Sequence, residues 1–271
     1  MKTQTRLEHC DKAIEHYSRA INLKPNFAIA YYRRGNTYLI KGNVDHNKDN
    51  YDRAIKDFTL AIAFKPDFAK AYNDRGLAYA KKGDNNRAID DFNRTIQLNP
   101  NDAVAYYNRG IVYEDKGEID RAIDDYTKTI QLNPNDAAAY NNRGITYWDK
   151  GDYDLAIGDL TKTIELNPND DVAYNNRGNA YWDKGDYDRA IDDFTKAIQL
   201  NPNYADAYNN RGEAWLHLEQ WEKAKSDLTT PRDMEMDIIT SFHNNYESVS
   251  DFESQHDIQL RPDIAAMLTP Q

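Results

Sequence analysis

The sequence predicts an all-α fold, a solenoid of stacked antiparallel helix pairs. Its 271 residues spell NPNDAVAYYNRG at 99–110 and nearly the same twelve residues at 133–144, 167–178 and 201–212. Prolines recur at the same 34-residue spacing, at positions 66, 100, 134, 168 and 202. Within each period the apolar residues follow helical rather than alternating spacing. A fixed period of this length is typical of stacked supersecondary units, none of which buries its apolar face alone.

Residues 103–136 illustrate one unit. Asn101 and Asp102 are cap-type residues before the first helical pattern, and Gly117 is placed to end that helix in a left-handed conformation. The dipeptide at 133–134 stops the second helix, because a proline disfavours helical geometry in the residue before it. The apolar stripes of the two expected helices are Tyr106, Gly110 and Tyr113, then Ala122, Tyr126 and Ile130.

Repetition of this unit predicts the domain organisation. Residues 1–27 form an N-terminal half-repeat or cap helix, and 231–271 form a C-terminal helical cap or extension. Between them, residues 28–230 form six repeats, at 28–68 with a seven-residue insertion, 69–102, 103–136, 137–170, 171–204 and an imperfect 205–230. The insertion, in GNVDHNKDNY, is expected to be a solvated loop, because it lacks the bidentate glutamate of a calcium loop.

These positions resemble the tetratricopeptide repeat family. Counting from Ala103 as position 1, the pattern has an aromatic residue at 4, Gly at 8, Tyr at 11, Ala at 20, an aromatic at 24 and Pro at 32. Here these are Tyr106, Gly110, Tyr113, Ala122, Tyr126 and Pro134. The resemblance covers residues 11–230 and implies a right-handed superhelix whose first helices line a concave face that binds peptides.

Position 7, usually leucine in the family, is arginine in every repeat, and position 23 on the second helix is always aspartate. A half-buried guanidinium needs a partner, so we expect a charge-assisted Arg–Asp pair within each repeat. The expected structural pairs are Arg34–Asp57, Arg75–Asp91, Arg109–Asp125, Arg143–Asp159, Arg177–Asp193 and Arg211–Asp227.

Position 6 predicts a binding surface, because positions 4, 8 and 11 are committed to packing and leave position 6 free. An asparagine side chain both donates and accepts, so a stacked series suits the backbone of an extended peptide. The alternative is that asparagine only fills a repeated surface position. The residues at position 6 are Arg33, Asp74, Asn108, Asn142, Asn176 and Asn210.

Aromatic and acidic side chains flank this expected ladder. Aromatic rings beside carboxylates suit a segment that alternates apolar and basic side chains. The tryptophans are equally suited to packing between neighbouring repeats. The flanking residues are Tyr107, Trp148, Trp182, Asp115, Asp149 and Asp183.

Composition narrows the function. The formal net charge is −11, which disfavours nucleic acid and anionic membranes and favours a neutral-to-basic protein partner, or serves only solubility. No apolar run or leader suggests a membrane span or secretion, so a cytoplasmic protein is expected. The sequence shows no nucleophile–base constellation, phosphate loop, cofactor motif or close metal spacing. We therefore expect no enzyme activity, cofactor or metal.

The residues after the repeats predict a short helical tail. Thr230 and Pro231 suggest a helix start, followed by an apolar stripe of Ile238, Ile239 and Phe242, and Pro262 opens a last helix. A cap over the last repeat is the first interpretation, and a ligand-like helix for another protein is the second.

Together these features predict a non-catalytic scaffold that binds an extended peptide in its groove. The alternative is a regulatory or substrate-recruiting arm of an enzyme or larger assembly. The family's carboxylate clamp for chaperone C-termini is disfavoured, because no three successive repeats supply its lysine, asparagine and arginine residues.

Overall fold

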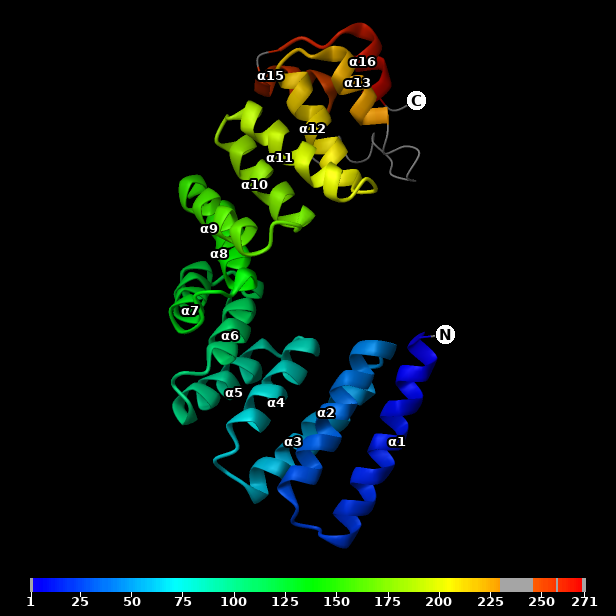
Figure 1. Cartoon of the computed structure of the whole chain (residues 1–271), viewed down its shortest axis with the longest axis vertical. Helices are drawn as coiled ribbons and strands as arrows, with labels where there is room; N and C mark the ends of the chain where they lie inside the picture. The colour runs from blue at the N-terminus through cyan, green and yellow to red at the C-terminus, as the bar shows by residue number, and fades with distance from the viewer. Residues whose placement is uncertain (1, 230–245, 257, 270–271) are drawn as a thin grey trace. The chain divides into compact units, whose positions relative to one another are not determined.

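Helices and short turns make up the described backbone (Figure 1). The computed structural model describes residues 2–229, 246–256 and 258–269, and these residues contain no β-strand. The tail residues Thr230, Pro231, Ile238, Ile239 and Phe242 lie outside the described residues. Among the residues that the structure describes, no helix has the length and apolar character needed to cross a membrane.

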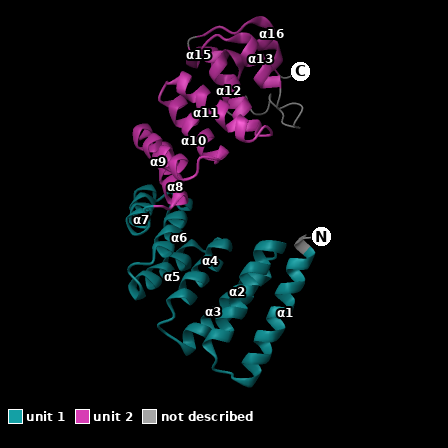
Figure 2. Ribbon diagram, viewed as in Figure 1, with its two compact units in different colours: residues 1–134 teal, residues 135–271 magenta. Residues whose placement is uncertain are grey.

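The chain divides into two compact units, residues 1–134 and 135–271 (Figure 2). Unit 1 contains α1 (Lys2–Leu23), α2 (Ala28–Asp45), α3 (Lys48–Phe64), α4 (Ala69–Lys81), α5 (Asn85–Leu98), α6 (Ala103–Asp115) and α7 (Ile119–Leu132). Unit 2 contains α8 (Ala137–Asp149), α9 (Tyr153–Leu166), α10 (Asp171–Asp183), α11 (Tyr187–Leu200), α12 (Ala205–His217), α13 (Trp221–Thr229), α15 (Val249–His256) and α16 (Pro262–Leu268).

Each unit is a stack of helix pairs. In unit 1, α2 packs on α3, α4 on α5 and α6 on α7, while α3 also contacts α4 and α5 contacts α6. Unit 2 repeats this order with α8–α9, α10–α11 and α12–α13. The predicted all-α solenoid of helix pairs is confirmed.

Local chemistry sets the ends of the helices. Asp102 caps α6 by accepting a hydrogen bond from the Ala105 backbone N–H, and Asp136 and Asp170 cap α8 and α10 in the same way. Gly117 lies between α6 and α7 at φ +72°. A residue with a Cβ is strained in that conformation, so the turn between the paired helices requires glycine.

The paired helices approach closely where position 8 meets position 24. A Cβ built on Gly110 would lie 2.8 Å from Cε1 of Tyr126, and one on Gly178 would lie 2.5 Å from Cε1 of Phe194. Both rings are almost fully buried. Glycine is therefore required here for packing and not for backbone conformation.

Every position-7 arginine forms two parallel hydrogen bonds with the position-23 aspartate of its own repeat. The Nε and Nη2 atoms of Arg34, Arg75, Arg109, Arg143, Arg177 and Arg211 lie 2.7–2.8 Å from the carboxylate oxygens of Asp57, Asp91, Asp125, Asp159, Asp193 and Asp227. The hydrogen bonds to Asp57 and Asp159 raise the pKa of Arg34 and Arg143. This geometry is the strong, bidentate form of an ion pair.

The remaining guanidinium nitrogen reaches the preceding helix pair. Nη1 of Arg75 donates to the Thr59 hydroxyl and Nη1 of Arg177 donates to that of Thr161, both at 3.0 Å. Ser18, Asn93 and Thr195 accept from Arg34, Arg109 and Arg211 in the same way. These arginines therefore join three helices, where the sequence argument expected two.

The insertion is largely helical, so the expected loop is wrong, while residues 46–49 are exposed to solvent as expected. It lengthens α2 to 18 residues and α3 to 17, compared with 13 and 14 in α6 and α7. Asn50 is buried and donates to Asp45 at 2.9 Å, and the Tyr51 hydroxyl donates to Asn43 at 3.0 Å. These contacts stabilise the additional turns.

The terminal segments pack on the repeats of their own units. In unit 1, α1 lies along α2, with Lys41 donating to Asp11 at 2.5 Å. In unit 2, the C-terminal residues bury apolar side chains against the last helix pair. This cluster contains Leu216, Ala224 and Leu228 of the repeat and Tyr246, Phe252, Leu260, Ile264 and Leu268 of the C-terminal residues.

Candidate functional site

The position-6 asparagines form hydrogen bonds within each unit. The amide nitrogen of Asn108 donates to the side-chain oxygen of Asn73 at 3.1 Å, one repeat earlier. In unit 2, Asn176 donates to Asn141 at 3.4 Å, and Asn210 donates to Asn175 at 3.1 Å. The stacked asparagines therefore hold successive repeats together.

These bonds change what the ladder can offer a ligand. The amide nitrogen of Asn210 uses both donor hydrogens, for Asn175 and Asn179, so it offers a peptide backbone its side-chain oxygen. Asn108 and Asn176 each use one of their two donor hydrogens in the bonds between repeats. Asn142 also has a partner within the protein. In the last repeat, Asn209 has no following position-6 asparagine, and its buried side-chain oxygen has no hydrogen-bond partner among the described residues.

In unit 1, the position-6 carboxylate of Asp74 is hydrogen-bonded within the protein. Asp74 accepts hydrogen bonds from the Tyr32 hydroxyl at 2.9 Å, from Asn36 at 3.1 Å and from Asn73 at 3.0 Å. Burial, followed by the nearby Asp74 charge, raises the pKa of Tyr32. Arg33 is exposed and lies 5.9 Å from the centroid of the Tyr32 ring.

Two residues of unit 1 that were predicted to flank the asparagine ladder, Tyr107 and Asp115, do not lie in one site with it. Tyr107 is half-buried and packs on Tyr126 with ring centroids 5.9 Å apart, so it belongs largely to the core. Asp115 is exposed at the end of α6. Asp149 occupies the equivalent exposed position at the end of α8 in unit 2.

Unit 2 contains a cavity of about 640 Å³ along its first helices. Four residues predicted from the sequence line it, two tryptophans and two polar side chains: Trp148, Trp182, Asp183 and Asn210. Six further lining residues are Asn179, Phe194, Glu213, Tyr246, Gln255 and His256. The cavity therefore joins the first helices of three successive repeats to the C-terminal residues.

The two tryptophans both line the cavity and pack between repeats. The Trp148 indole N–H donates to the Asp183 carboxylate at 2.5 Å, and its ring packs near the buried cluster of Ala156, Leu160 and Ala180. Trp182 meets the His217 ring of the next repeat edge-on at a centroid distance of 5.6 Å. Packing between repeats, one of the two alternatives left open by the sequence, therefore leaves both tryptophans at the cavity wall.

A pair of histidines lies beside Trp182. Nε2 of His217 and Nδ1 of His256 are 2.9 Å apart, and Nε2 of His256 lies 3.2 Å from the Tyr246 hydroxyl. Desolvation lowers the pKa of both imidazoles. Two ring nitrogens can share a hydrogen bond only when one of them carries no proton, which agrees with a neutral pair.

Sequence reasoning did not single out the C-terminal side of this cavity. Asn179 and Glu213 occupy position 9, on the free stripe of the first helix, so the repeat pattern could have identified them. Tyr246, Gln255 and His256 lie after the repeats. No periodic signal links them to the tryptophans.

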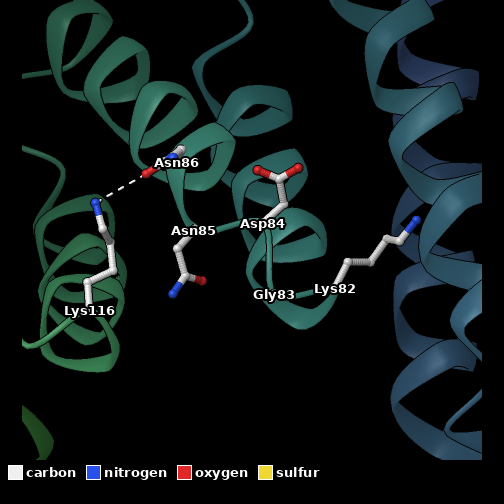
Figure 3. A pocket seen from close by; sticks show the side chains of 6 residues that line it. All are labelled: Lys82, Gly83, Asp84, Asn85, Asn86 and Lys116. Carbon is white, nitrogen blue, oxygen red and sulfur yellow. Dashed lines mark hydrogen bonds between the residues drawn. The ribbon is translucent and has the colours of Figure 1, made fainter.

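A second type of cavity lies at the turns between paired helices. Figure 3 shows the example in unit 1, lined by Lys82, Gly83, Asp84, Asn85, Asn86 and Lys116. Lys116 donates to Asn86 at 3.1 Å, and Lys82 is paired with Asp52. Similar crevices occur at the Gly151 and Gly185 turns of unit 2. They are a property of the repeat and carry no functional assignment.

No metal centre is evident in the part of the chain that the structure describes. There, no three His, Cys, Asp or Glu side chains are grouped so as to hold an ion.

Comparison with known families decides the classification. The family model described as tetratricopeptide repeat matches residues 69–102, 103–136, 137–170 and 172–204. A second tetratricopeptide repeat model matches 194–226, and one described as TPR repeat matches 8–42 and 42–83. The chain belongs to the tetratricopeptide repeat family. Tetratricopeptide repeats thus extend over most of its length.

Solved tetratricopeptide repeat structures resemble this one. A crystal structure of MamA is 31% identical, covers 61% of this chain and 96% of its own, and has a TM-score of 0.56. YrrB is 24% identical over 72% of this chain and 96% of its own, with a TM-score of 0.58. PilF of Pseudomonas aeruginosa is 16% identical over 76% of this chain and 91% of its own, with a TM-score of 0.64. No curated protein matches the sequence.

Proposed function

We propose that this tetratricopeptide repeat protein is a non-catalytic scaffold that binds an extended peptide segment of a partner protein. The segment lies along the first helices, with the unit 2 cavity as its principal contact. The stacked asparagines accept hydrogen bonds from its backbone, and the indoles and carboxylates around them favour a neutral-to-basic sequence. We propose a cytoplasmic location for this interaction.

The cavity carries this proposal. It combines indole rings with amide and carboxylate groups on three successive repeats, and its volume of about 640 Å³ lies in the range of ligand sites. Apolar walls with a few polar groups provide both binding energy and orientation. YrrB, which has the same fold, is described as a TPR protein with an unusual peptide-binding site.

A display library of random peptides, selected on the full-length protein, tests the proposal. Two matched variants locate the binding surface. Asn108→Ala removes one inter-repeat hydrogen bond, to Asn73 at 3.1 Å, and Asn210→Ala removes two, to Asn175 at 3.1 Å and Asn179 at 3.0 Å. Both changes therefore loosen the contact between repeats, but only Asn210 lines the cavity.

We expect the wild-type protein to enrich peptides whose affinity falls about tenfold or more in Asn210→Ala, as for loss of a central contact. A smaller loss in Asn108→Ala would show that the ladder also contributes in unit 1. Failure to enrich any peptide, or equal binding to all three proteins, would overturn the proposal. Helicity measured by circular dichroism serves as the folding control.

A further inference from the structure

We propose that the unit 2 cavity is a recognition site for an arginine side chain. The inference rests on the proposed function, because the arginine belongs to the bound partner segment. Its guanidinium would pair with Asp183 and stack on the indoles of Trp148 and Trp182. Glu213, which accepts a hydrogen bond from Asn209 at 2.9 Å, lies on the α12 side of the same cavity.

The charge balance of the cavity is the first observation. Its ten lining residues include two carboxylates, Asp183 and Glu213, and no lysine or arginine. The remaining ionisable lining groups are Tyr246 and His256, whose pKa values are shifted towards the neutral forms, mainly by desolvation. Among the described lining residues, nothing supplies a positive charge at neutral pH.

Asp183 is the centre of this imbalance. Its carboxylate accepts a hydrogen bond from the Trp148 indole, and it has no ion pair with any described residue. Desolvation raises its pKa. By contrast, the neighbouring acidic residues Asp154 and Asp186 are paired with Lys184 and Arg189. Asp183 is exposed at the end of α10. Its carboxylate is therefore accessible to a cation of a ligand while no described cation of the protein neutralises it.

The repeats already show which cation fits such surroundings. Arg121 lies 4.0 Å from the centroid of the Tyr113 ring and forms an ion pair with Glu118 at 2.5 Å. In unit 2, Arg189 lies 4.6 Å from the Tyr181 ring centroid and pairs with Asp186. Each site combines an aromatic face, a carboxylate and a guanidinium. The cavity has the aromatic faces and the carboxylate.

Arginine suits this site better than lysine. A planar guanidinium can stack on an indole and also hydrogen-bond a carboxylate through its edge, whereas an ammonium group is a compact and strongly hydrated charge. A cavity of about 640 Å³ leaves room for the aliphatic part of the side chain as well. The expected order of binding is arginine, then lysine, then a neutral analogue.

N-acetyl-arginine methylamide tests the inference without a known partner. N-acetyl-citrulline methylamide is the matched probe, because citrulline keeps the shape of arginine and lacks its charge. Both are titrated into the isotope-labelled full chain, and the indole N–H signals of its four tryptophans are followed by NMR. The proteins compared are wild type, Asp183→Asn and Asp115→Asn, the last changing an exposed residue at the equivalent position of unit 1.

We expect the arginine probe to shift the Trp148 and Trp182 signals in wild type and in Asp115→Asn. The citrulline probe on wild type, and the arginine probe on Asp183→Asn, should bind about tenfold more weakly or worse, as for loss of a charge-assisted hydrogen bond. Equal effects of the two probes, an undiminished response in Asp183→Asn, or no response to arginine up to about 10 mM, a Kd limit that corresponds to very weak binding, would overturn the inference.

This experiment separates the inference from the proposed function. Arginine binding without any selected peptide would support the site and contradict the peptide scaffold. Selected peptides that depend on Asn210 but bind equally when their arginines are replaced by citrulline would support the scaffold and contradict the arginine site.

Discussion

The first helices of unit 1 and unit 2 have the same repeat pattern but treat their polar side chains differently. In unit 1, Asp74 accepts three hydrogen bonds from neighbouring side chains. In unit 2, Asp183 accepts one, from Trp148, and faces a cavity. Both acids stand on a first helix at positions outside the packing stripe. The comparison teaches that the repeat sets the framework, while a few individual positions decide whether a carboxylate is hydrogen-bonded by its neighbours or faces a cavity.

The largest effects should come from the shared framework and should be equal in the two units. Asp125→Ala in unit 1 and Asp193→Ala in unit 2 each leave a half-buried guanidinium without its carboxylate. We expect each change to lower the free energy of unfolding by about 3 kcal/mol, as for breaking a buried ion pair. Urea unfolding followed by circular dichroism measures the loss.

The neighbouring residues provide the control for this prediction. Asp124 and Asp192 precede the paired aspartates and are exposed. Their replacement by alanine should change stability by less than about 0.5 kcal/mol. A loss below 1 kcal/mol in both Asp125→Ala and Asp193→Ala would show that the arginine pairs are not a main stabilising feature.

Substitution of the glycines at the close helix contacts should lower stability by different amounts in the two units. Gly178→Ala brings a Cβ to within 2.5 Å of the Phe194 ring, whereas Gly110→Ala brings one to within 2.8 Å of Tyr126. Overpacking of this kind costs about 1–3 kcal/mol, and we expect the greater cost at Gly178. At Gly158, in the middle of α9, an added Cβ would have no atom within 4 Å. Gly158→Ala should therefore stabilise the protein by about 0.5–1 kcal/mol.

Tryptophan fluorescence makes this comparison possible. All four tryptophans, Trp148, Trp182, Trp215 and Trp221, lie in unit 2, while circular dichroism reports on both units. Gly178→Ala should shift the fluorescence transition. If circular dichroism showed a greater loss of stability for Gly110→Ala than for Gly178→Ala, the contact distances would not explain the ranking.

Much of this framework could be predicted from the sequence, because a repeated residue meets the same surroundings in every repeat. The alternation of Arg109 and Asp125 along the chain was enough to suggest a pair, and the atoms lie at hydrogen-bonding distance. The Asn108–Asn73 bond was not foreseen, because position 5 varies between tyrosine and asparagine.

The cavity could be predicted only in part, for a physical reason. Trp148 and Trp182 recur at one repeat position, so the pattern identifies them. His256 and Tyr246 reach the cavity through packing of a non-repeated segment on α12 and α13. Such packing depends on the shape of an apolar surface, which no spacing in the sequence encodes. The helical insertion was missed because its contacts, such as Asn50 with Asp45, are likewise unique.

Acidification should affect unit 2 through its histidine pair. Desolvation lowers the pKa of His217 and His256 below 6.5 in the folded protein, so the unfolded chain binds more protons at mildly acidic pH. Their neutral contacts stabilise fully above pH 6.5, and this stability is lost as the pH falls below 6.5 towards the lower folded values. We expect the fluorescence transition to lose about 1 kcal/mol between pH 7.5 and 5.5.

A double variant tests whether this pH dependence belongs to the pair. His217→Gln with His256→Gln removes both titrating groups while keeping hydrogen-bonding side chains. Its unit 2 transition should be less stable at pH 7.5 and nearly independent of pH down to 5.5. Persistence of the full pH effect in the double variant would assign it to other residues.

The smallest effects should come from the lysines at the interhelical turns, and again they should be equal in the two units. Lys82 pairs with Asp52 in unit 1, and Lys184 pairs with Asp154 in unit 2. Both aspartates are largely exposed, so solvent screens the attraction and the side chains lose freedom in making it. Lys82→Met and Lys184→Met should each change the free energy of unfolding by less than about 0.5 kcal/mol, measured by urea unfolding in low and high salt. A loss above 1 kcal/mol that disappears in high salt would show that charges at the turns contribute as much as the histidine contacts. If only one of the two variants showed this loss, the difference between the units would not be confined to the cavity and its C-terminal wall.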